Sequence, residues 1–187
     1  MMNRTMMKLV VGTEAMFFLS LIIGFVYMAY NAGFEPHQVE QLNIEKTGIF
    51  SVMLVASSFT LMLAENKYKH GKINSLKIWL GITILLGAIF LVGQGNEYAN
   101  LIHKNITLSG SIFGTSFYAL TGFHGLHVFI GLVILSIMLL LVFLGDFNRP
   151  NSSAISTVAI YWHFVDIVWV IVFGVVYVLP FFNHFKR

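Results

Sequence analysis

The sequence predicts an all-α fold: a polytopic membrane protein whose five transmembrane helices form one bundle. Of its 187 residues, 57% are hydrophobic and only 10% are charged, and the mean hydropathy is +0.81. A soluble domain usually carries about 25% charged residues. Five apolar stretches also approach the roughly 20 residues that one membrane span needs. We therefore expect residues 1–187 to form a single transmembrane domain.

The first expected helix covers residues 9–30 and follows Arg4 and Lys8. This charged start is similar to that of a signal peptide. However, the apolar stretch continues past Tyr30 without a small-residue cleavage site, so we expect a retained span. The second and third expected helices cover residues 47–64 and 78–96. Polar loops are expected at 31–46, 65–77 and 97–111.

The fourth expected helix, residues 112–143, lies in a segment with no charged residue between Lys104 and Asp146. Such a stretch could contain a tight hairpin. One long tilted helix is favoured, because Pro is absent and the polar residues 105–111 lie at one end only. The fifth expected helix covers residues 155–182 and follows a loop rich in turn-forming residues.

The basic residues predict that the N-terminus lies inside, because loops on the inner side carry more Lys and Arg. One side holds Arg4, Lys8, Lys67, Lys69, Lys72, Lys77 and Arg149, and the other holds Lys46, Lys104, Lys186 and Arg187. The two terminal cations weakly oppose this orientation. The absence of Lys and Arg from residues 31–45 supports it.

Composition also limits the partners and cofactors. The net charge is +3, but the cations are scattered between apolar stretches, so lipid headgroups are expected as anionic neighbours and nucleic acid is not. The chain has no Cys. Disulfides, thioether-linked haem and thiolate metal ligands are therefore excluded.

The segment YWHFVDIVW places His163 and Asp166 three residues apart inside an apolar stretch. Inserting an Asp at the centre of a membrane costs roughly 2.5 to 3.5 kcal/mol, so such residues face a protein interior or a polar cavity. Positions i and i+3 share a helix face. We therefore expect a direct hydrogen bond between His163 and Asp166. Of a proton relay, a metal site and a structural pair, the structural pair is favoured.

Glu14 is a second carboxylate in an apolar stretch, within GTEAMFF. Two interpretations are equally supported. Its side chain could reach the headgroups or pair with Lys8, or it could make a buried contact with protein or lipid.

The segment TGFHGLHVFIG places His124 and His127 on one helix face. Gly110, Gly114, Thr121 and Gly125 follow at helical spacings that include a GxxxG step, so this face is expected to be a packing seam. Paired histidines can also hold haem or a metal. Dimetal sites in helix bundles use Glu-x-x-His, which is absent here, so packing and hydrogen bonding are favoured over metal binding.

Two further features are expected to be structural. Glu97, beside Tyr98, could lie on a proton pathway, but a helix-end carboxylate at the membrane interface is favoured. Trp162 and Trp169 are expected in helix contacts or an interfacial belt. No nucleophile elbow or phosphate-binding Gly-rich loop occurs.

In this order, these motifs resemble subunit III of the haem–copper terminal oxidases, which are the cytochrome c and quinol oxidases. The matching segments are GTEAMFFLSLIIGFVYMAY, Glu97–Tyr98, GSIFGTSFYALTGFHGLHVFIG and YWHFVDIVWVIVFGVVYVLPFF. The resemblance covers almost the whole chain. Family members commonly have seven helices, and these five correspond to the last five. A neighbouring subunit is therefore expected to replace the first two, which in larger members form one arm of a phospholipid-holding cleft.

The resemblance implies a non-catalytic subunit of an aerobic respiratory complex in a bacterial inner membrane. It would bind no haem or copper, which belong to partner subunits. It would pack directly on catalytic subunit I, protect it from inactivation, and support proton uptake and oxygen access. Subunit II, a small subunit IV or another respiratory complex, and membrane phospholipid are the other expected partners.

The resemblance also implies roles for single residues. By motif match, Glu14 is the carboxylate that carbodiimides modify in the family, and His124, His127, His163 and Asp166 form the polar interior of the bundle. The chain departs from many relatives at Ser156, where they carry Glu. The segment LLLVFLGDFNRP also lacks an Arg that some relatives use near a lipid phosphate. The family's lipid contacts are therefore not carried over.

Two alternatives remain. One is an accessory membrane subunit of nitric oxide reductase, which the motifs alone do not separate from an oxidase subunit. The other is a metal-binding membrane protein that uses the histidines.

Overall fold

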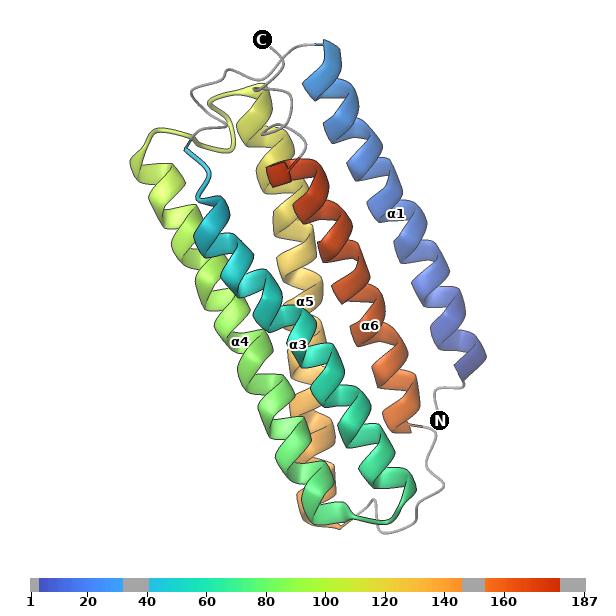
Figure 1. Ribbon diagram of the computed structural model, residues 1–187. Coiled ribbons are helices and arrows are strands. Elements are labelled where there is room, and N and C mark those ends of the chain that lie inside the picture. The colour runs from blue at the N-terminus through green and yellow to red at the C-terminus, as the bar shows by residue number, and fades with distance from the viewer. Residues whose placement is uncertain (1–3, 32–40, 146–153, 179–187) are drawn as a thin grey trace.

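The computed structural model describes residues 4–31, 41–145 and 154–178, and these form five long helices (Figure 1). The helices are α1 (Arg4–Asn31), α3 (Ile44–Lys69), α4 (Ile73–His103), α5 (Ile112–Leu144) and α6 (Ala154–Phe173), and one π-helical turn, η1 (Gly174–Val178), continues α6. All five are long and apolar enough to cross a membrane. No strand occurs within the described ranges. The predicted all-α polytopic membrane fold is confirmed.

Several helices extend further than predicted. α3 continues to Lys69, and α4 begins at Ile73 and ends at His103. The expected loop at 65–77 is therefore wrong, since only residues 70–72 separate the two helices. The prediction ended each helix where apolar residues end. Polar residues at the interface can extend a helix beyond the hydrocarbon, because the helix satisfies its own backbone hydrogen bonds.

The ends of the helices have identifiable local causes. The side chain of Asn43 accepts a hydrogen bond from the Lys46 amide (3.0 Å) at the start of α3. Gly71, with φ +71°, forms the tight turn into α4. Ser111 accepts a hydrogen bond from the Gly114 amide (2.9 Å), and Gly145, with φ +88°, ends α5 in the left-handed conformation. Such caps satisfy backbone groups that the helix leaves free.

α5 is a single unbroken helix of 33 residues, so the alternative of a hidden hairpin is wrong. At 1.5 Å per residue it is about 50 Å long. The start of α5 at Ile112 also corrects the predicted packing seam, because Gly110 lies in the preceding turn. Gly110 and Gly114 therefore do not form a GxxxG step on one helix. The expected fifth helix, 155–182, is described as far as Val178, and residues 179–182 lie outside the described ranges.

α6 is the most enclosed helix of the bundle. It packs against α1, α3 and α5, while α3 and α4 form an antiparallel hairpin beside it (Figure 1). Half of the most apolar window of α6 is buried, against 11% of the window in α1. The YWHFVDIVW segment therefore lies where several helices meet.

Trp162 of α6 fits into a space left by two glycines. A Cβ atom at Gly87 of α4 or at Gly131 of α5 would lie 2.8 Å from the indole ring. The indole is fully buried. These glycines leave room for the indole of α6 against α4 and α5, which is the usual role of small residues between membrane helices.

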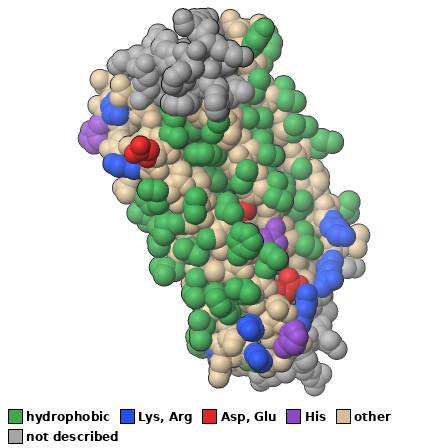
Figure 2. All heavy atoms as spheres, viewed as in Figure 1, with side chains coloured by type: hydrophobic (Ala, Val, Ile, Leu, Met, Phe, Trp, Pro, Cys, Tyr) green, Lys and Arg blue, Asp and Glu red, His purple; other side chains and the backbone are tan. Residues whose placement is uncertain are grey.

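The outer surface is apolar over the middle of the bundle. Figure 2 shows hydrophobic side chains across the central part of one face, with most Lys, Arg and carboxylate side chains near its two ends. Exposed large hydrophobic side chains occur on each of the five helices. This distribution suits contact with lipid or with other membrane subunits.

Candidate functional site

Ser58 of α3 links the two polar residues of the YWHFVDIVW segment. Its hydroxyl lies 2.9 Å from His163 Nδ1 and donates a hydrogen bond to Asp166 Oδ2. The expected direct bond between His163 and Asp166 is therefore replaced, within the described residues, by a path through Ser58. Because a serine hydroxyl has one hydrogen, which goes to Asp166, His163 Nδ1 must carry the hydrogen that it donates to Ser58.

Asp166 is only 4% exposed, and its second carboxylate oxygen, Oδ1, has no hydrogen-bond partner within the described protein. Its placement facing α3 avoids the cost of a carboxylate in hydrocarbon. The spacing in the sequence predicted that His163 and Asp166 lie close together, and both contact Ser58. It did not reveal Ser58, which is 105 residues from His163 in the chain.

Glu14 of α1 pairs with His127 of α5. Glu14 Oε2 lies 3.0 Å from His127 Nε2. His127 Nδ1 lies 2.7 Å from the carbonyl oxygen of Phe123. A carbonyl can only accept, so Nδ1 carries a hydrogen. A proton must then also lie between Nε2 and Oε2, since two lone pairs would repel. The pair is imidazolium with carboxylate, or imidazole with carboxylic acid.

Of the contacts expected for Glu14, the described residues show one with protein. The side chain contacts protein, on the helix opposite, and not Lys8. It retains 32% exposure, against 12% for the His127 side chain. The carboxylate therefore remains partly accessible from the apolar surface.

His124 has different surroundings from His127, three residues away. It is fully buried, and its ring stacks on Trp169, with centroids 4.7 Å apart, and meets Phe90 edge-on. Neither ring nitrogen has a hydrogen-bond partner among the described protein atoms. The two histidines were predicted to share a helix face. In the structure His124 makes aromatic contacts and His127 makes a polar one.

The two tryptophans of α6 bind serines of α3. Trp169 Nε1 donates to Ser51 Oγ (2.8 Å), and Trp162 Nε1 donates to Ser57 Oγ (2.9 Å). Each serine hydroxyl donates in turn to a carbonyl of its own helix. The lone pairs of each serine oxygen are therefore free to accept a hydrogen bond from the indole N–H. The tryptophans thus make helix contacts, and the serines were not identified from the sequence because each is a common, short polar residue.

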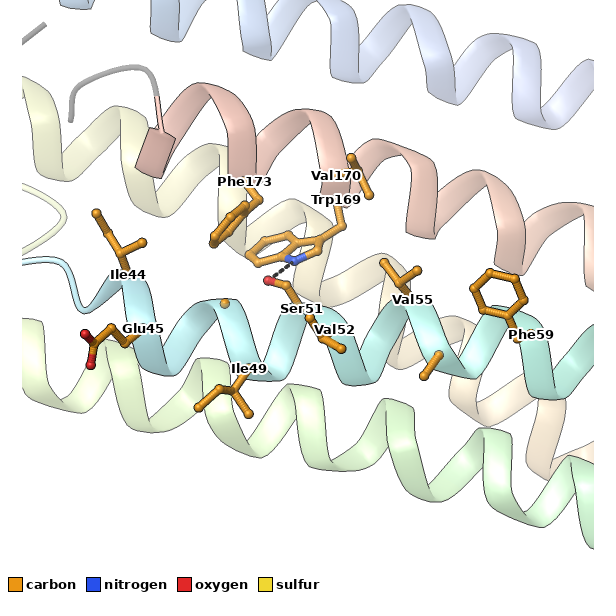
Figure 3. Close-up of a pocket in the computed structure, with 12 residues that line it drawn as sticks. Ile44, Glu45, Ile49, Ser51, Val52, Val55, Phe59, Trp169, Val170 and Phe173 are labelled. Atoms are coloured by element: carbon orange, nitrogen blue, oxygen red, sulfur yellow. Dashed lines mark hydrogen bonds between the residues drawn. The ribbon is translucent and has the colours of Figure 1, made fainter. Parts of the chain in front are cut away.

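An apolar groove of about 680 Å³ lies between α3 and α6, beside the Trp169–Ser51 bond (Figure 3). Ile49, Val52, Val55 and Phe59 line its α3 side. Apart from Ser51 and Glu45, the lining side chains are apolar. The groove suits hydrocarbon and offers no set of groups for catalysis.

Glu97 lies within α4, not at its end. The helix continues to His103, and Glu97 is only 7% exposed. Its Oε1 accepts a hydrogen bond from the Asn43 amide (3.1 Å), which joins the start of α3 to α4. The expected place at the helix end is therefore wrong, because α4 continues beyond Glu97 to His103, and the expected place near the membrane interface stays a prediction.

Ser156, where the resemblance implied a Glu in many relatives, makes a polar contact to another helix. Ser156 of α6 donates a hydrogen bond to Glu65 Oε1 (2.6 Å), which also pairs with Lys69 (3.0 Å). The carboxylate at this place therefore comes from α3. Residue spacing could not show it, since Glu65 and Ser156 are 91 residues apart.

The described residues contain no group of three or more His, Asp or Glu side chains that could hold a metal ion. The polar residues are distributed as pairs and short chains between helices. Their geometry supports helix association, and the role of each residue stays a prediction.

The profile of the family described as "Cytochrome c oxidase subunit III" matches residues 2–180. The chain belongs to this family. A "Probable cytochrome c oxidase subunit 3" of Nocardia farcinica is 39% identical over 167 residues, which are 89% of this chain and 82% of the relative. A "Cytochrome c oxidase subunit 3" of Bacillus subtilis is 33% identical over 172 residues, 91% and 83% of the two chains.

A similar relative of Corynebacterium diphtheriae, "Cytochrome c oxidase subunit 3", is 34% identical over 166 residues, 89% of this chain and 78% of the relative. The resemblance seen in the motifs is thus confirmed. A subunit 3 implies a multi-subunit oxidase complex, and the five apolar helices make the chain an integral membrane protein. The family is consistent with cofactors held by other subunits.

Proposed function

We propose that this chain is a non-catalytic accessory subunit III of a proton-pumping haem–copper oxidase in a bacterial inner membrane. It packs on catalytic subunit I, protects it from inactivation during turnover, and supports proton uptake and oxygen access. The observation that carries this proposal is the use of the interior polar residues. Glu14 with His127, and Ser58 with His163 and Asp166, join helices of this chain to one another.

The shape of the bundle is a second support. α1 packs on α5 and α6 along one side, and only 11% of its most apolar window is buried. A span with so little cover from its own chain is available to lipid or a neighbouring subunit. This agrees with a role for α1 in contact with another subunit of the complex.

The first test concerns attachment to the complex. Asp166→Ala removes one polar contact between α3 and α6, and Ser58→Ala removes the contacts to both His163 and Asp166, so the bundle should loosen and be lost from the purified oxidase. Losing a buried hydrogen-bond partner costs about 1 to 3 kcal/mol. The measurements are the ratio of this chain to subunit I after detergent purification, and the number of turnovers before inactivation.

Ser20→Ala is the matched control, because Ser20 bonds only a carbonyl of its own helix among the described residues. It should keep full occupancy. If Asp166→Ala and Ser58→Ala complexes also keep full occupancy, thermal stability and turnover lifetime, the stabilising role is wrong. Stoichiometric iron or copper retained by the isolated chain would instead favour the metal-binding alternative.

A further inference from the structure

A polar pocket of about 390 Å³ lies between the start of α3 and the last turns of α4. It is separate from the apolar groove between α3 and α6, which lies on another side of α3. Lys46, Thr47 and Phe50 form one wall, and the other consists of Gly93, Asn96, Glu97, Ala99, Asn100 and His103. The two walls belong to the first turns of α3 and the last turns of α4, where we expect each span to leave the hydrocarbon and meet the headgroups.

The lining side chains offer both signs of charge. The Lys46 ammonium, the amides of Asn96 and Asn100 and the His103 ring are donors, which suit a phosphate. No ion pair to Lys46 occurs among the described residues. Glu97 is the one carboxylate in the lining. It favours a ligand that carries a cation next to its phosphate and disfavours a purely anionic ligand.

Contacts within the chain hold the two walls of the pocket in place. The bond from the Asn43 amide to Glu97 Oε1 (3.1 Å) ties the first turn of α3 to α4. The ring of Phe50 lies directly over Gly93, where any side chain would collide with it. This contact gives the pocket an apolar wall on the hydrocarbon side. A preformed site loses less entropy on binding than a flexible one.

We propose that this pocket binds the headgroup of a phospholipid with a primary ammonium group, as in phosphatidylethanolamine. The phosphate lies against Lys46 and the Asn side chains, and the ammonium faces Glu97. The acyl chains continue along the apolar surface of α3 and α4. This site goes beyond the proposed function and does not depend on the contact with subunit I.

Two features favour this headgroup over other lipids. Phosphatidylcholine has a cation but no N–H donor for the carboxylate. Phosphatidylglycerol has hydroxyl donors but a net negative charge, which Glu97 repels. A free phosphate would lack both the cation and the acyl chains.

The test uses the purified oxidase complex containing this chain, delipidated in detergent and titrated separately with each of the three lipids. Bound lipids are counted by native mass spectrometry. The wild-type complex should retain phosphatidylethanolamine most tightly. Lys46→Gln should weaken its binding about fivefold, the effect of losing one cation near a lipid phosphate. Glu97→Gln keeps the acceptor for Asn43 and should reduce the preference for phosphatidylethanolamine over phosphatidylcholine.

Matched controls come from the same end of the bundle. Lys104 contacts the Gln41 carbonyl and does not line the pocket, so Lys104→Gln should leave lipid binding unchanged. Glu45 lines the apolar groove instead, so Glu45→Gln should preserve the preference (Figure 3). Equal effects of Lys46→Gln and Lys104→Gln would overturn the site. Equal or tighter phosphatidylcholine or phosphatidylglycerol binding to wild type, or displacement by millimolar inorganic phosphate, would overturn the headgroup assignment.

Discussion

His124 and His127 lie one turn apart on α5, yet their surroundings differ in kind. Both ring nitrogens of His127 have hydrogen-bond partners, which are the Phe123 carbonyl and the Glu14 carboxylate. His124 lies in an aromatic cluster with Trp169 and Phe90. His127 thus makes hydrogen bonds, whereas His124 makes aromatic contacts.

Phenylalanine substitutions should separate these two uses. We expect His124→Phe to change the free energy of unfolding by less than about 1 kcal/mol, because a ring still stacks on Trp169 and no protein hydrogen bond is lost. His127→Phe should cost about 1 to 3 kcal/mol, because Glu14 loses its partner. The measurement is the temperature at which this subunit is lost when the purified complex is heated. Similar losses for both variants would contradict the distinction.

At the scale of helices, the α6 surface decides the packing of the bundle. Its tryptophans bond the serines of α3, and its Trp162 ring fills the space between Gly87 and Gly131. Hydrogen bonds between membrane helices contribute modestly, whereas close packing requires small residues at the contact. α6 therefore stabilises the bundle through close packing as well as through hydrogen bonds.

Two glycines of α4 allow this to be tested. Gly87→Ala places a methyl group 2.8 Å from a fully buried indole, so we expect a loss of about 1 to 3 kcal/mol from overpacking. Gly81 lies on the same helix, and a Cβ atom added there would meet nothing within 4 Å, so Gly81→Ala should be neutral or slightly stabilising. Thermal stability in detergent distinguishes them. Equal stability of the two variants would show that Trp162 moves without cost.

At the scale of the whole molecule, the distribution of charge relates the bundle to the two sides of the membrane. Lys67, Lys69, Lys72 and Lys77 lie around the turn between α3 and α4, and Arg4 and Lys8 begin α1. Lys46 and Lys104 lie at the other ends of α3 and α4. The positive-inside rule therefore still predicts that the N-terminus lies inside.

The chain has no Cys, so single cysteines can report this orientation. Lys72→Cys and Ser109→Cys lie at exposed positions in turns at opposite ends of the bundle. In intact cells, a membrane-impermeant maleimide should label Ser109→Cys and not Lys72→Cys. Labelling of both variants after permeabilisation is the control for accessibility. The reverse pattern in intact cells would place the N-terminus outside.

The number and order of the spans followed from apolar length alone, because the thickness of the hydrocarbon imposes a length on every helix that crosses it. The exact helix ends did not, since polar residues can extend a helix past the hydrocarbon. The loop predicted at 65–77 became a turn of three residues for this reason, and Glu97 became an interior residue of α4.

The sequence by itself determined the fold class, the five spans, and which polar residues share a helix face, such as His163 with Asp166. These are local properties, set by hydropathy and the helical repeat. Only the tertiary structure decided what each polar residue contacts. The partners Ser58, Glu14 and Ser51 come from other helices, more than 100 residues away in the chain from the groups they bind. Contacts over such separations depend on how helices pack, which no single segment encodes.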